Sequence, residues 1–385
     1  MQNMDQFDVL VVYSEAIAQS ASQKYAVFPF DPYSRRANYN DAYAYFLKYC
    51  ARKSLKAAFA TSADIVGAGK CSSYWTYKNN FWVKTDRLCS SKQIFDKFSP
   101  VNKDQTIKRK LFFSSSEVKP FNDKDLFQVF FDKYKTYLQL KTFSIPTVVV
   151  KNANVETIDK ALKKLEELIK KIDKEDFTED IVIKDRFGAG GNNIYKIKAD
   201  YAKEIQKIVK KKKKVSFVAQ PFLKFDKGLA PKKFSGFIDI RLIYHNGNIV
   251  QTYIRAAKEN DFRCNEHQGG TLTYVSKRRI PQRVLKLSLK VAKKLNKKHA
   301  LFALDFIVTN NNKVYLLEGN TGPGIDWNLL KKVNEKRAKL FIRAIVKDLA
   351  QTIHKSKAKI VKPTNCLEKC DAILTPIGVT RFPIQ

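Results

Sequence analysis

Two carboxylates and one amide lie on neighbouring apolar segments in the last quarter of the chain. Asp305 stands within ALDFIV, Glu318 and Asn320 stand within KVYLLEGN, and the short turn NNNK joins the two segments. Residues two positions apart on a strand point to the same face, and a tight turn folds two strands side by side. We therefore expect the three side chains to converge on one face of a β-hairpin.

Oxygen ligands of this kind suit Mg²⁺, which binds one or two carboxylates together with phosphate oxygens. The alternative is a salt bridge, because a carboxylate on an inward-facing apolar strand otherwise needs a cation. The turn TGPG follows Asn320 directly and would hold its amide in place. That rigidity favours the metal over the salt bridge.

A lysine and a run of glycines form a second candidate site. Lys184 ends the apolar segment DIVIK, and the turn after it contains Gly188, Ala189, Gly190 and Gly191. Glycines let the backbone close over an anion and direct N–H groups at it, while a lysine adds a point charge. A tight β-turn has the same composition, and the segment is neither a Walker A loop nor a dinucleotide fingerprint.

The segment FVAQPFLKFD is the third feature. It contains a proline-stiffened strand end, made of Gln220, Pro221, Phe222 and Leu223. Such a segment between two domains can offer backbone groups to an adenine edge, while Gln220 and Asp226 could bind the exocyclic amine and the ribose hydroxyls. A plain domain linker is the alternative interpretation.

Arginines on two paired strands form the fourth feature. Arg241 and Arg255 lie on segments joined by HNGN, a strong β-hairpin signal, and Asn265 and His267 follow shortly afterwards. Arginine offers a fixed, always charged fork for phosphoryl oxygens or carboxylates. We expect His267 to position a ligand by hydrogen bonding rather than to act as a catalytic base.

Alternating apolar segments and turns indicate the elements that must hold these residues. The chain has 385 residues, of which 44% are hydrophobic, enough for two or three domains. The first 120 residues predict a small α/β domain, with a buried strand at FDVLVVYS, a helix over 41–52 and a strand at KAAFATS. The segments FWVKTDRL and RKLFFSS are expected to add further strands.

The remainder predicts an α+β unit. One helical stretch is expected from 123 to about 143, and the helix after it has apolar residues at the spacing of one buried face: Ile158, Leu162, Leu165, Leu168 and Ile169. Further helices are expected over 202–209, 283–296 and 328–352, with strands between them. The resulting division of the chain is 1–120, 121–217, 218–360 and an irregular tail, 361–385.

Composition argues against several classes of protein. No segment approaches the ~20 apolar residues of a membrane span, and the N-terminus lacks a signal-peptide pattern, so we expect a soluble cytoplasmic protein. Six cysteines, without a second pair to complete a zinc site, are interpreted as reduced thiols. The net charge of +35 indicates either an anionic partner or a lysine-rich bias, and KKKKK over 210–214 complements the C-terminus of a predicted helix.

The four features follow the order found in ATP-grasp enzymes. FIDIRLIY…YIRAAKENDFRCNEHQGG, together with ALDFIV…LLEGNTGPGIDW, resembles the RimK-like carboxylate–amine ligases, the family of the ribosomal-protein glutamate ligase and, more distantly, glutathione synthetase. Asp132 and Lys133, followed by IPT, resemble the opening of the same domain. The resemblance covers about 121–350, and the first domain matches only in general α/β character.

The resemblance implies an α/β N-terminal domain followed by an α+β ATP-grasp fold, whose two subdomains sandwich ATP. It implies ATP and Mg²⁺ as cofactors, with Mn²⁺ as a second candidate metal, and Asp305, Glu318 and Asn320 as metal ligands. Arg255 would steady the transferred phosphoryl group, and Arg241, Asn265 and His267 would lie beside substrate or phosphate. The implied nucleotide-binding residues are Lys133, Lys184, Gly188, Ala189, Gly190, Gly191, Gln220, Pro221, Phe222, Leu223 and Asp226.

The implied activity joins a carboxylate to an amine through an acylphosphate, with an amino acid, a peptide or a protein tail as substrates. The positive charge points to an acidic or ribosome-associated partner, and no membrane partner is expected. Gln268 and Gly319 replace the arginine and the branched residue usual in the glutamate-ligase branch, which argues against glutamate as substrate. Two alternatives stay open: phosphate transfer to an acceptor that is not a carboxylate, and a non-catalytic, basic nucleic-acid-binding protein on the same scaffold.

Overall fold

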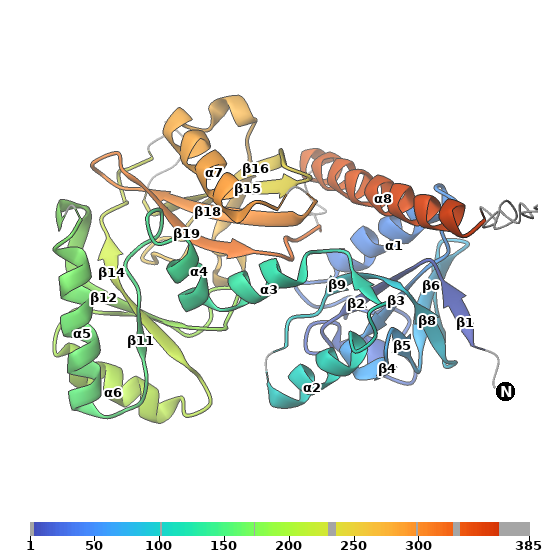
Figure 1. The fold of residues 1–385 in the computed structure, drawn as a ribbon, viewed down its shortest axis with the longest axis horizontal. Helices are drawn as coiled ribbons and strands as arrows, with labels where there is room; N and C mark the ends of the chain where they lie inside the picture. Colours follow the sequence, from blue (N-terminus) through green and yellow to red (C-terminus); the bar gives the residue numbers. More distant parts are fainter. Residues whose placement is uncertain are drawn as a thin grey trace, which may run out of the picture.

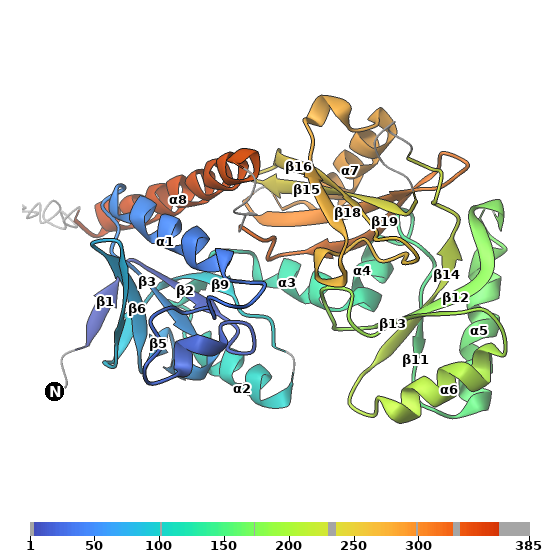
Figure 2. The same ribbon diagram turned by 180° about the vertical axis from the view of Figure 1, so that it is seen from behind.

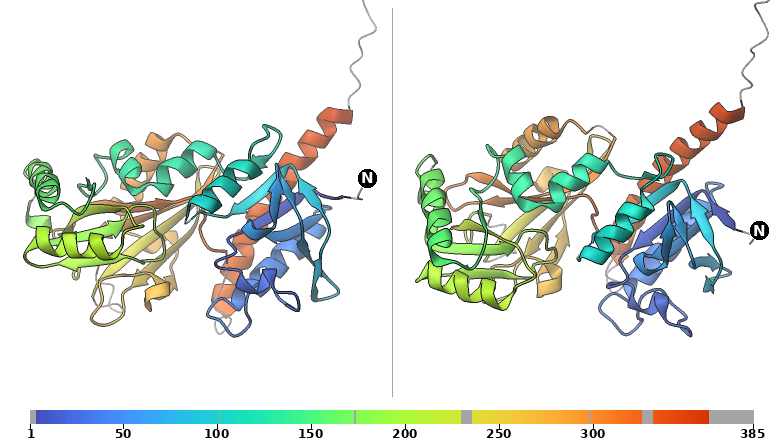
Figure 3. Two further views of the ribbon diagram at one scale, coloured as in Figure 1. Left: turned by 90° about the horizontal axis from the view of Figure 1, so that it is seen from below. Right: turned by 60° about the horizontal axis from the view of Figure 1, so that its bottom comes forward.

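The computed structural model describes residues 4–100, 102–172, 174–229, 236–297, 299–325 and 332–361. An N-terminal unit (up to residue 121) and a central unit (122–325) lie side by side, and the last helix, α8, returns to the N-terminal unit (Figures 1 and 3). The predicted tail lies outside the described residues from 362 onward. No helix in the described ranges is long and apolar enough to cross a membrane.

The N-terminal unit is built on two sheets, with strand orders β10-β9-β2-β3-β6-β7 and β1-β8-β5-β4. Strand β2 is buried throughout and pairs in parallel with β3 and β9, as its continuous apolar run predicts. The helices are α1 (Asn38–Ala51) and α2 (Lys103–Phe112). The strands are β1 (Asp5–Phe7), β2 (Val9–Tyr13), β3 (Ala57–Thr61), β4 (Ile65–Gly67), β5 (Lys70–Cys71), β6 (Tyr74–Lys78), β7 (Phe81–Thr85), β8 (Cys89–Ser91), β9 (Gln93–Lys97) and β10 (Lys119–Pro120).

The strand predicted at RKLFFSS is wrong, because this segment forms the end of α2 and the turn after it. Asn102 starts the helix by accepting a hydrogen bond from the backbone N–H of Gln105 at 2.9 Å. Phe112 is buried in the core and Phe113 packs against it, whereas Leu111 is exposed. A short apolar run does not distinguish a strand from the last turn of a helix, and here the N-terminal cap decides.

The central unit contains two antiparallel sheets, which we call lobe A and lobe B. Lobe A has the order β11-β14-β12-β13 and carries α5 and α6, at the end far from the N-terminal unit (Figure 2). Lobe B has the order β17-β16-β15-β18-β19 and carries α7. The strands are β11 (Val148–Val150), β12 (Phe177–Asp185), β13 (Ile194–Ile197), β14 (Phe217–Leu223), β15 (Ile238–His245), β16 (Asn248–Ala256), β17 (Thr271–Tyr274), β18 (Leu301–Val308) and β19 (Val314–Asn320).

The helices of the central unit largely follow the sequence patterns. They are α3 (Lys124–Phe131), α4 (Lys133–Gln139), α5 (Val155–Ile169), α6 (Tyr201–Lys211) and α7 (Gln282–Leu295). One prediction is wrong: the single helical stretch before Pro146 is two helices. Asp132 has an extended backbone, and its carboxylate accepts the N–H of Tyr134 at 2.9 Å, which begins α4 afresh.

Helix α8 (Lys332–Val361) packs mainly on α1 of the N-terminal unit and also contacts β16 of lobe B. Its residues Phe341, Ile342 and Ile345 join the same buried cluster as Phe46 of α1. The residues 328–331 of the predicted helix lie outside the described ranges. The chain therefore ties its two units together through α8 as well as through α3.

Candidate functional site

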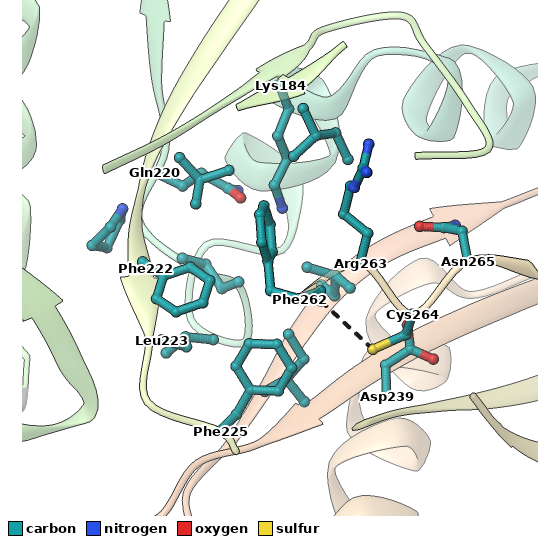
Figure 4. Close-up of a pocket in the computed structure, with 16 residues that line it drawn as sticks. Lys184, Gln220, Phe222, Leu223, Phe225, Asp239, Phe262, Arg263, Cys264 and Asn265 are labelled. Carbon is teal, nitrogen blue, oxygen red and sulfur yellow. Dashed lines mark hydrogen bonds between the residues drawn. The ribbon is translucent and has the colours of Figure 1, made fainter. Parts of the chain in front are cut away.

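A pocket of about 550 Å³ lies between lobe A and lobe B (Figure 4). Strands β12 and β14 supply one wall, and β18, β19 and the loop after β16 supply the other. Lys184 and Gln220 point into it from lobe A. Six residues singled out from the sequence line this pocket: Lys184, Gln220, Pro221, Phe222, Leu223 and Asn265.

The amide of Gln220 is only half satisfied. Its Nε2 donates to Thr147 Oγ1 at 2.8 Å, whereas its buried Oε1 has no hydrogen-bond partner among the described residues. A buried acceptor without a donor is costly, and a ligand with an N–H group, such as the exocyclic amine of a purine, would satisfy it. Val182, Phe222 and Leu317 add an apolar lining that suits a flat ring.

Among the described residues, two cations line this pocket, Lys184 and Arg263, and Arg263 is paired with Asp261. Burial lowers the pKa of the Lys184 ammonium to about 8, an effect that Glu318 opposes and Lys133 reinforces. Lys133 itself donates to the carbonyl of Gly188 in the glycine turn. A phosphate would stabilise the charged form of Lys184, so the pocket offers an apolar hollow with a cation beside it.

Strand register gathers charged residues on one face of lobe B. The HNGN turn joins β15 to β16 as predicted, with left-handed backbone at Asn246 and Gly247, as a type I′ turn requires. In the resulting register, Asp239 pairs with Arg255 across β15 and β16, Arg241 pairs with Asp305 across β15 and β18, and Glu318 pairs with Asp305 across β18 and β19.

Two arginines enclose Asp305, which is only 1% exposed. Arg241 donates from Nε and Nη2 to its two carboxylate oxygens, both at 2.6 Å, and Arg255 donates to its Oδ2 at 2.8 Å. Burial opposes ionisation of Asp305, but the two guanidinium groups outweigh burial and hold the pKa of this carboxyl well below its usual range. Arg255 also donates twice to Asp239, whose pKa burial raises to about 6 despite that contact.

The three predicted metal ligands share one hairpin, as expected, but they differ in their surroundings. Asp305 is salt-bridged, which is the alternative that the sequence left open. Glu318 is 30% exposed in its side chain and lies 3.8 Å from Arg241 Nη2, and Asn320 Oδ1 accepts the N–H of Gly322 at 2.7 Å. Two carboxylates and an amide oxygen are donors that Mg²⁺ accepts. The described residues contain no group of three His, Cys, Asp or Glu side chains suited to a metal, so Asn320 is needed to complete this set.

The glycine turn faces a second, larger cleft of about 3100 Å³ between the N-terminal and central units. Gly188, Ala189 and Gly190 line it, together with His267 on the side of lobe B. Gln268 fastens the turn, because its Nε2 donates to the carbonyl of Gly190 at 3.1 Å. A side chain at Gly191 is excluded, since its Cβ would lie 2.8 Å from Gln268 Cγ.

Asp226 lies away from both hollows. Its side chain is exposed and accepts a hydrogen bond from Asn310 at 2.9 Å. Residues that the sequence did not single out also line the first pocket, among them Asp239, Phe262 and Cys264. Asp239 was detectable, because it stands two residues before Arg241 on the same strand and so shares its face. Phe262 belongs to an irregular loop, where no periodic pattern reports which way a side chain points.

Comparison with known proteins agrees with this geometry. The family model of the RimK-like ATP-grasp domain matches residues 132–345, more than half of the chain. No curated protein sequence matches. The solved structures similar in fold include D-cycloserine synthetase DcsG (TM-score 0.57, 12% identity, covering 90% of this chain and 99% of that one).

Two further structures extend the comparison. D-alanyl-alanine synthetase A from Vibrio cholerae has a TM-score of 0.53 and 12% identity, covering 91% of this chain and 99% of that one. A RiPP-associated ATP-grasp ligase from Chryseobacterium gregarium, in complex with ADP and a leader and core peptide, has a TM-score of 0.50 and 12% identity, covering 90% and 97%. At such identities the likeness shows the fold alone. With its matching family model, α/β N-terminal unit and two lobes around a pocket, the chain belongs to the RimK-like ATP-grasp family.

Proposed function

We propose that this protein is an ATP-dependent carboxylate–amine ligase that forms an amide bond through an acylphosphate. The observation that carries the proposal is the pocket between the lobes, which is lined by Gln220 with its unsatisfied oxygen and by Lys184, whose ammonium lies close enough to Glu318 for that carboxylate to oppose the lowering of its pKa. Family membership makes ATP the expected occupant. These residues fit the adenine, phosphate and metal parts of that ligand in this order.

Some of the side chains would bind the nucleotide, and others would neutralise the charge of its phosphates. Gln220 would accept the purine amine, Lys184 and Lys133 would contact phosphates, and the glycine turn would cover them. Asp305, Glu318 and Asn320 would hold Mg²⁺, which when bound would neutralise phosphate charge. Because Arg241 and Arg255 occupy Asp305, metal binding requires these guanidinium groups to release or share that carboxylate.

The proposed reaction has two steps. A substrate carboxylate oxygen forms a bond to the γ-phosphorus as the bond to ADP breaks, which gives an acylphosphate. An amine then attacks the acyl carbon, loses a proton and displaces phosphate, leaving an amide. Positioning and electrostatic stabilisation carry such a reaction, so no nucleophilic side chain is required.

The second cleft fits a large, anionic acceptor. Residues of the N-terminal unit, lobe A and lobe B all line it, which is a wider surface than a free amino acid would contact, and Arg35, Arg36 and Lys214 stand among them with Asp185 and Glu266 as the acidic lining residues. The relative from Chryseobacterium gregarium carries a leader and core peptide. We infer that the acceptor is an acidic peptide or protein tail, docked between the N-terminal unit and the glycine turn.

The test is ADP release by the purified protein with ATP and Mg²⁺, in the presence of pools of amino acids and acidic peptides. The proposal expects ADP release that depends on a carboxylate substrate and a product whose mass is the sum of the two substrates less water. ADP release with a phosphorylated acceptor and no amide would instead identify a phosphotransferase. No ADP release with any pool, together with unchanged nucleotide binding in Asp305→Ala and Glu318→Ala, would overturn the ligase.

Nucleotide binding is expected to weaken as pH rises above about 8. The lowered pKa of Lys184, about 8 without ligand, means that the charged form is lost earlier than in an ordinary lysine. A bound phosphate favours the charged form of Lys184, so above this pH the lysine takes up a proton when the nucleotide binds. The affinity for the nucleotide therefore falls by up to about tenfold per pH unit. Calorimetric titration with ADP from about pH 7 to about pH 9.5 measures this slope.

The matched variant for this titration is Lys184→Met. It is expected to bind ADP more weakly at pH 7 and to lose most of the decline above pH 8, because no ammonium remains to titrate there. A wild-type affinity that stays constant over the whole range, or a variant with the same slope as the wild type, would assign the pH dependence to another group.

A further inference from the structure

The turn after β19 is held from the side of the N-terminal unit. Lys97, the last residue of β9, donates from Nζ to the carbonyls of Gly322 at 2.9 Å and Pro323 at 2.7 Å. Asn122, in the connection between the units, donates to the carbonyl of Thr321 at 2.9 Å. Three consecutive carbonyls of one turn are therefore fixed by side chains about 200 residues earlier in the chain.

The same turn fixes the amide of Asn320. The N–H of Gly322 donates to Asn320 Oδ1 at 2.7 Å, while the carbonyl of Gly322 accepts from Lys97. A Cβ at Gly322 would lie 3.7 Å from Lys97 Nζ and 3.8 Å from Asn320 Oδ1, so both polar groups lie beside the same residue. Any displacement of this turn therefore moves the amide oxygen with it.

The N-terminal unit offers a rigid base for this lysine. β9 runs parallel to β2, which is fully buried, and Lys97 pairs in register with Tyr13 at the carboxyl ends of the two strands. Side chains at the carboxyl ends of parallel strands are the ones that open α/β sheets present to ligands and neighbouring domains. Here the carboxyl end of β9 faces the turn after β19 in lobe B, beside the proposed metal ligand Asn320.

We propose that Lys97 is a positioning residue that sets the orientation of Asn320 through the Gly322–Pro323 turn, so that the N-terminal unit completes the metal site of the central unit. This inference rests on the proposed function, in which Asn320 is a ligand of Mg²⁺. A metal binds more tightly to an amide ligand that a second group already holds in the binding orientation. Loss of such a supporting contact typically lowers metal affinity about 10–100-fold.

The experiment measures Mn²⁺ binding to the full chain in the presence of ADP, by electron paramagnetic resonance of the free ion. Lys97→Met removes both hydrogen bonds and is expected to weaken Mn²⁺ binding about tenfold or more. Lys97→Arg keeps a charged donor and is expected to retain most of the affinity. ADP binding without metal and the thermal unfolding midpoint are measured in parallel for each variant.

Lys92→Met is the matched control at the opposite end of β9, because Lys92 directly precedes that strand. Lys92 pairs with Glu117 at 2.7 Å, but the two side chains are 77% and 66% exposed, so this pair contributes little to stability and nothing to the turn. Its Mn²⁺ affinity is expected to equal that of the wild type.

The outcomes separate this inference from the proposed function. A Lys97→Met protein that binds Mn²⁺ as the wild type does, or whose loss is matched by Lys92→Met or by an equal loss of metal-free ADP affinity, overturns the role of Lys97 and leaves the ligase intact. A wild-type protein that binds ADP but no Mn²⁺ overturns the metal site itself. A selective loss in Lys97→Met, restored by Lys97→Arg, supports the inference.

Discussion

Asp305→Asn is expected to destabilise the fold by about 3–5 kcal/mol and to reduce ADP release at least about 100-fold. The carboxylate is 1% exposed and accepts hydrogen bonds from Arg241 and Arg255. Asparagine keeps the shape but removes the charge, which leaves the buried Arg241 with only the longer contact to Glu318 at 3.8 Å. Urea unfolding followed by circular dichroism measures the stability, and a coupled assay measures ADP.

Glu318→Gln is the matched variant, because Glu318 belongs to the same proposed metal site but is 30% exposed and lies 3.8 Å from Arg241. We expect it to lose activity to a similar extent while its free energy of unfolding changes by about 1 kcal/mol or less. This contrast separates the role of a carboxylate in activity from its role in the stability of the fold. Equal loss of stability in both variants, or full activity in either, would contradict the assignment.

Gly319→Ala is expected to have the second large effect, a loss of about 1–3 kcal/mol of stability. A Cβ at this position would lie 2.2 Å from the ring of Phe130 on α3. The ring and the strand cannot both stay in place, so β19 is expected to shift and to move the neighbouring Glu318. Urea unfolding measures the change, with Gly67→Ala as control, since a Cβ there meets only ordinary contacts at 3.6 Å.

The double variant Gly319→Ala with Phe130→Ala makes this prediction specific. Phe130→Ala alone is expected to cost about 3–5 kcal/mol by leaving a cavity. If the clash is the cause, the double variant loses less stability than the two single variants lose together. The difference, the coupling energy, is expected to be about 1 kcal/mol or more. Strictly additive losses would show that Gly319 is required for another reason.

The packing of Phe130 also accounts for the glycine at position 319. From the sequence, a glycine at 319 in place of a branched residue argued against glutamate as substrate. In the structure, α3 lies against this strand, and the glycine makes room for an aromatic ring. Packing against Phe130 therefore explains the glycine at position 319. Of the two replacements, only Gln268, which donates a hydrogen bond to the glycine turn, still argues against glutamate as substrate.

The sequence alone determined the parts of this protein that depend on neighbours along the chain. The two hairpins, one with Arg241 and Arg255 and the other with Asp305 and Glu318, follow from their short turns. The order of lysine, glycine turn, glutamine, arginines and carboxylates identified the family. The turns are local features, but the final pairing also depends on a register shift in each hairpin, between Ile243 and Tyr244 and between Asp305 and Phe306.

Tertiary structure decided which partners those side chains have. That Asp305 is enclosed by two arginines, that Asp226 lies outside the pocket, and that Lys97 holds the turn beside Asn320 all depend on how separate strands and units pack. The contact between Lys97 and Pro323 joins residues 226 positions apart. No periodicity extends over such a distance, because the free energy of that contact comes from the docking of two units rather than from the residues between them.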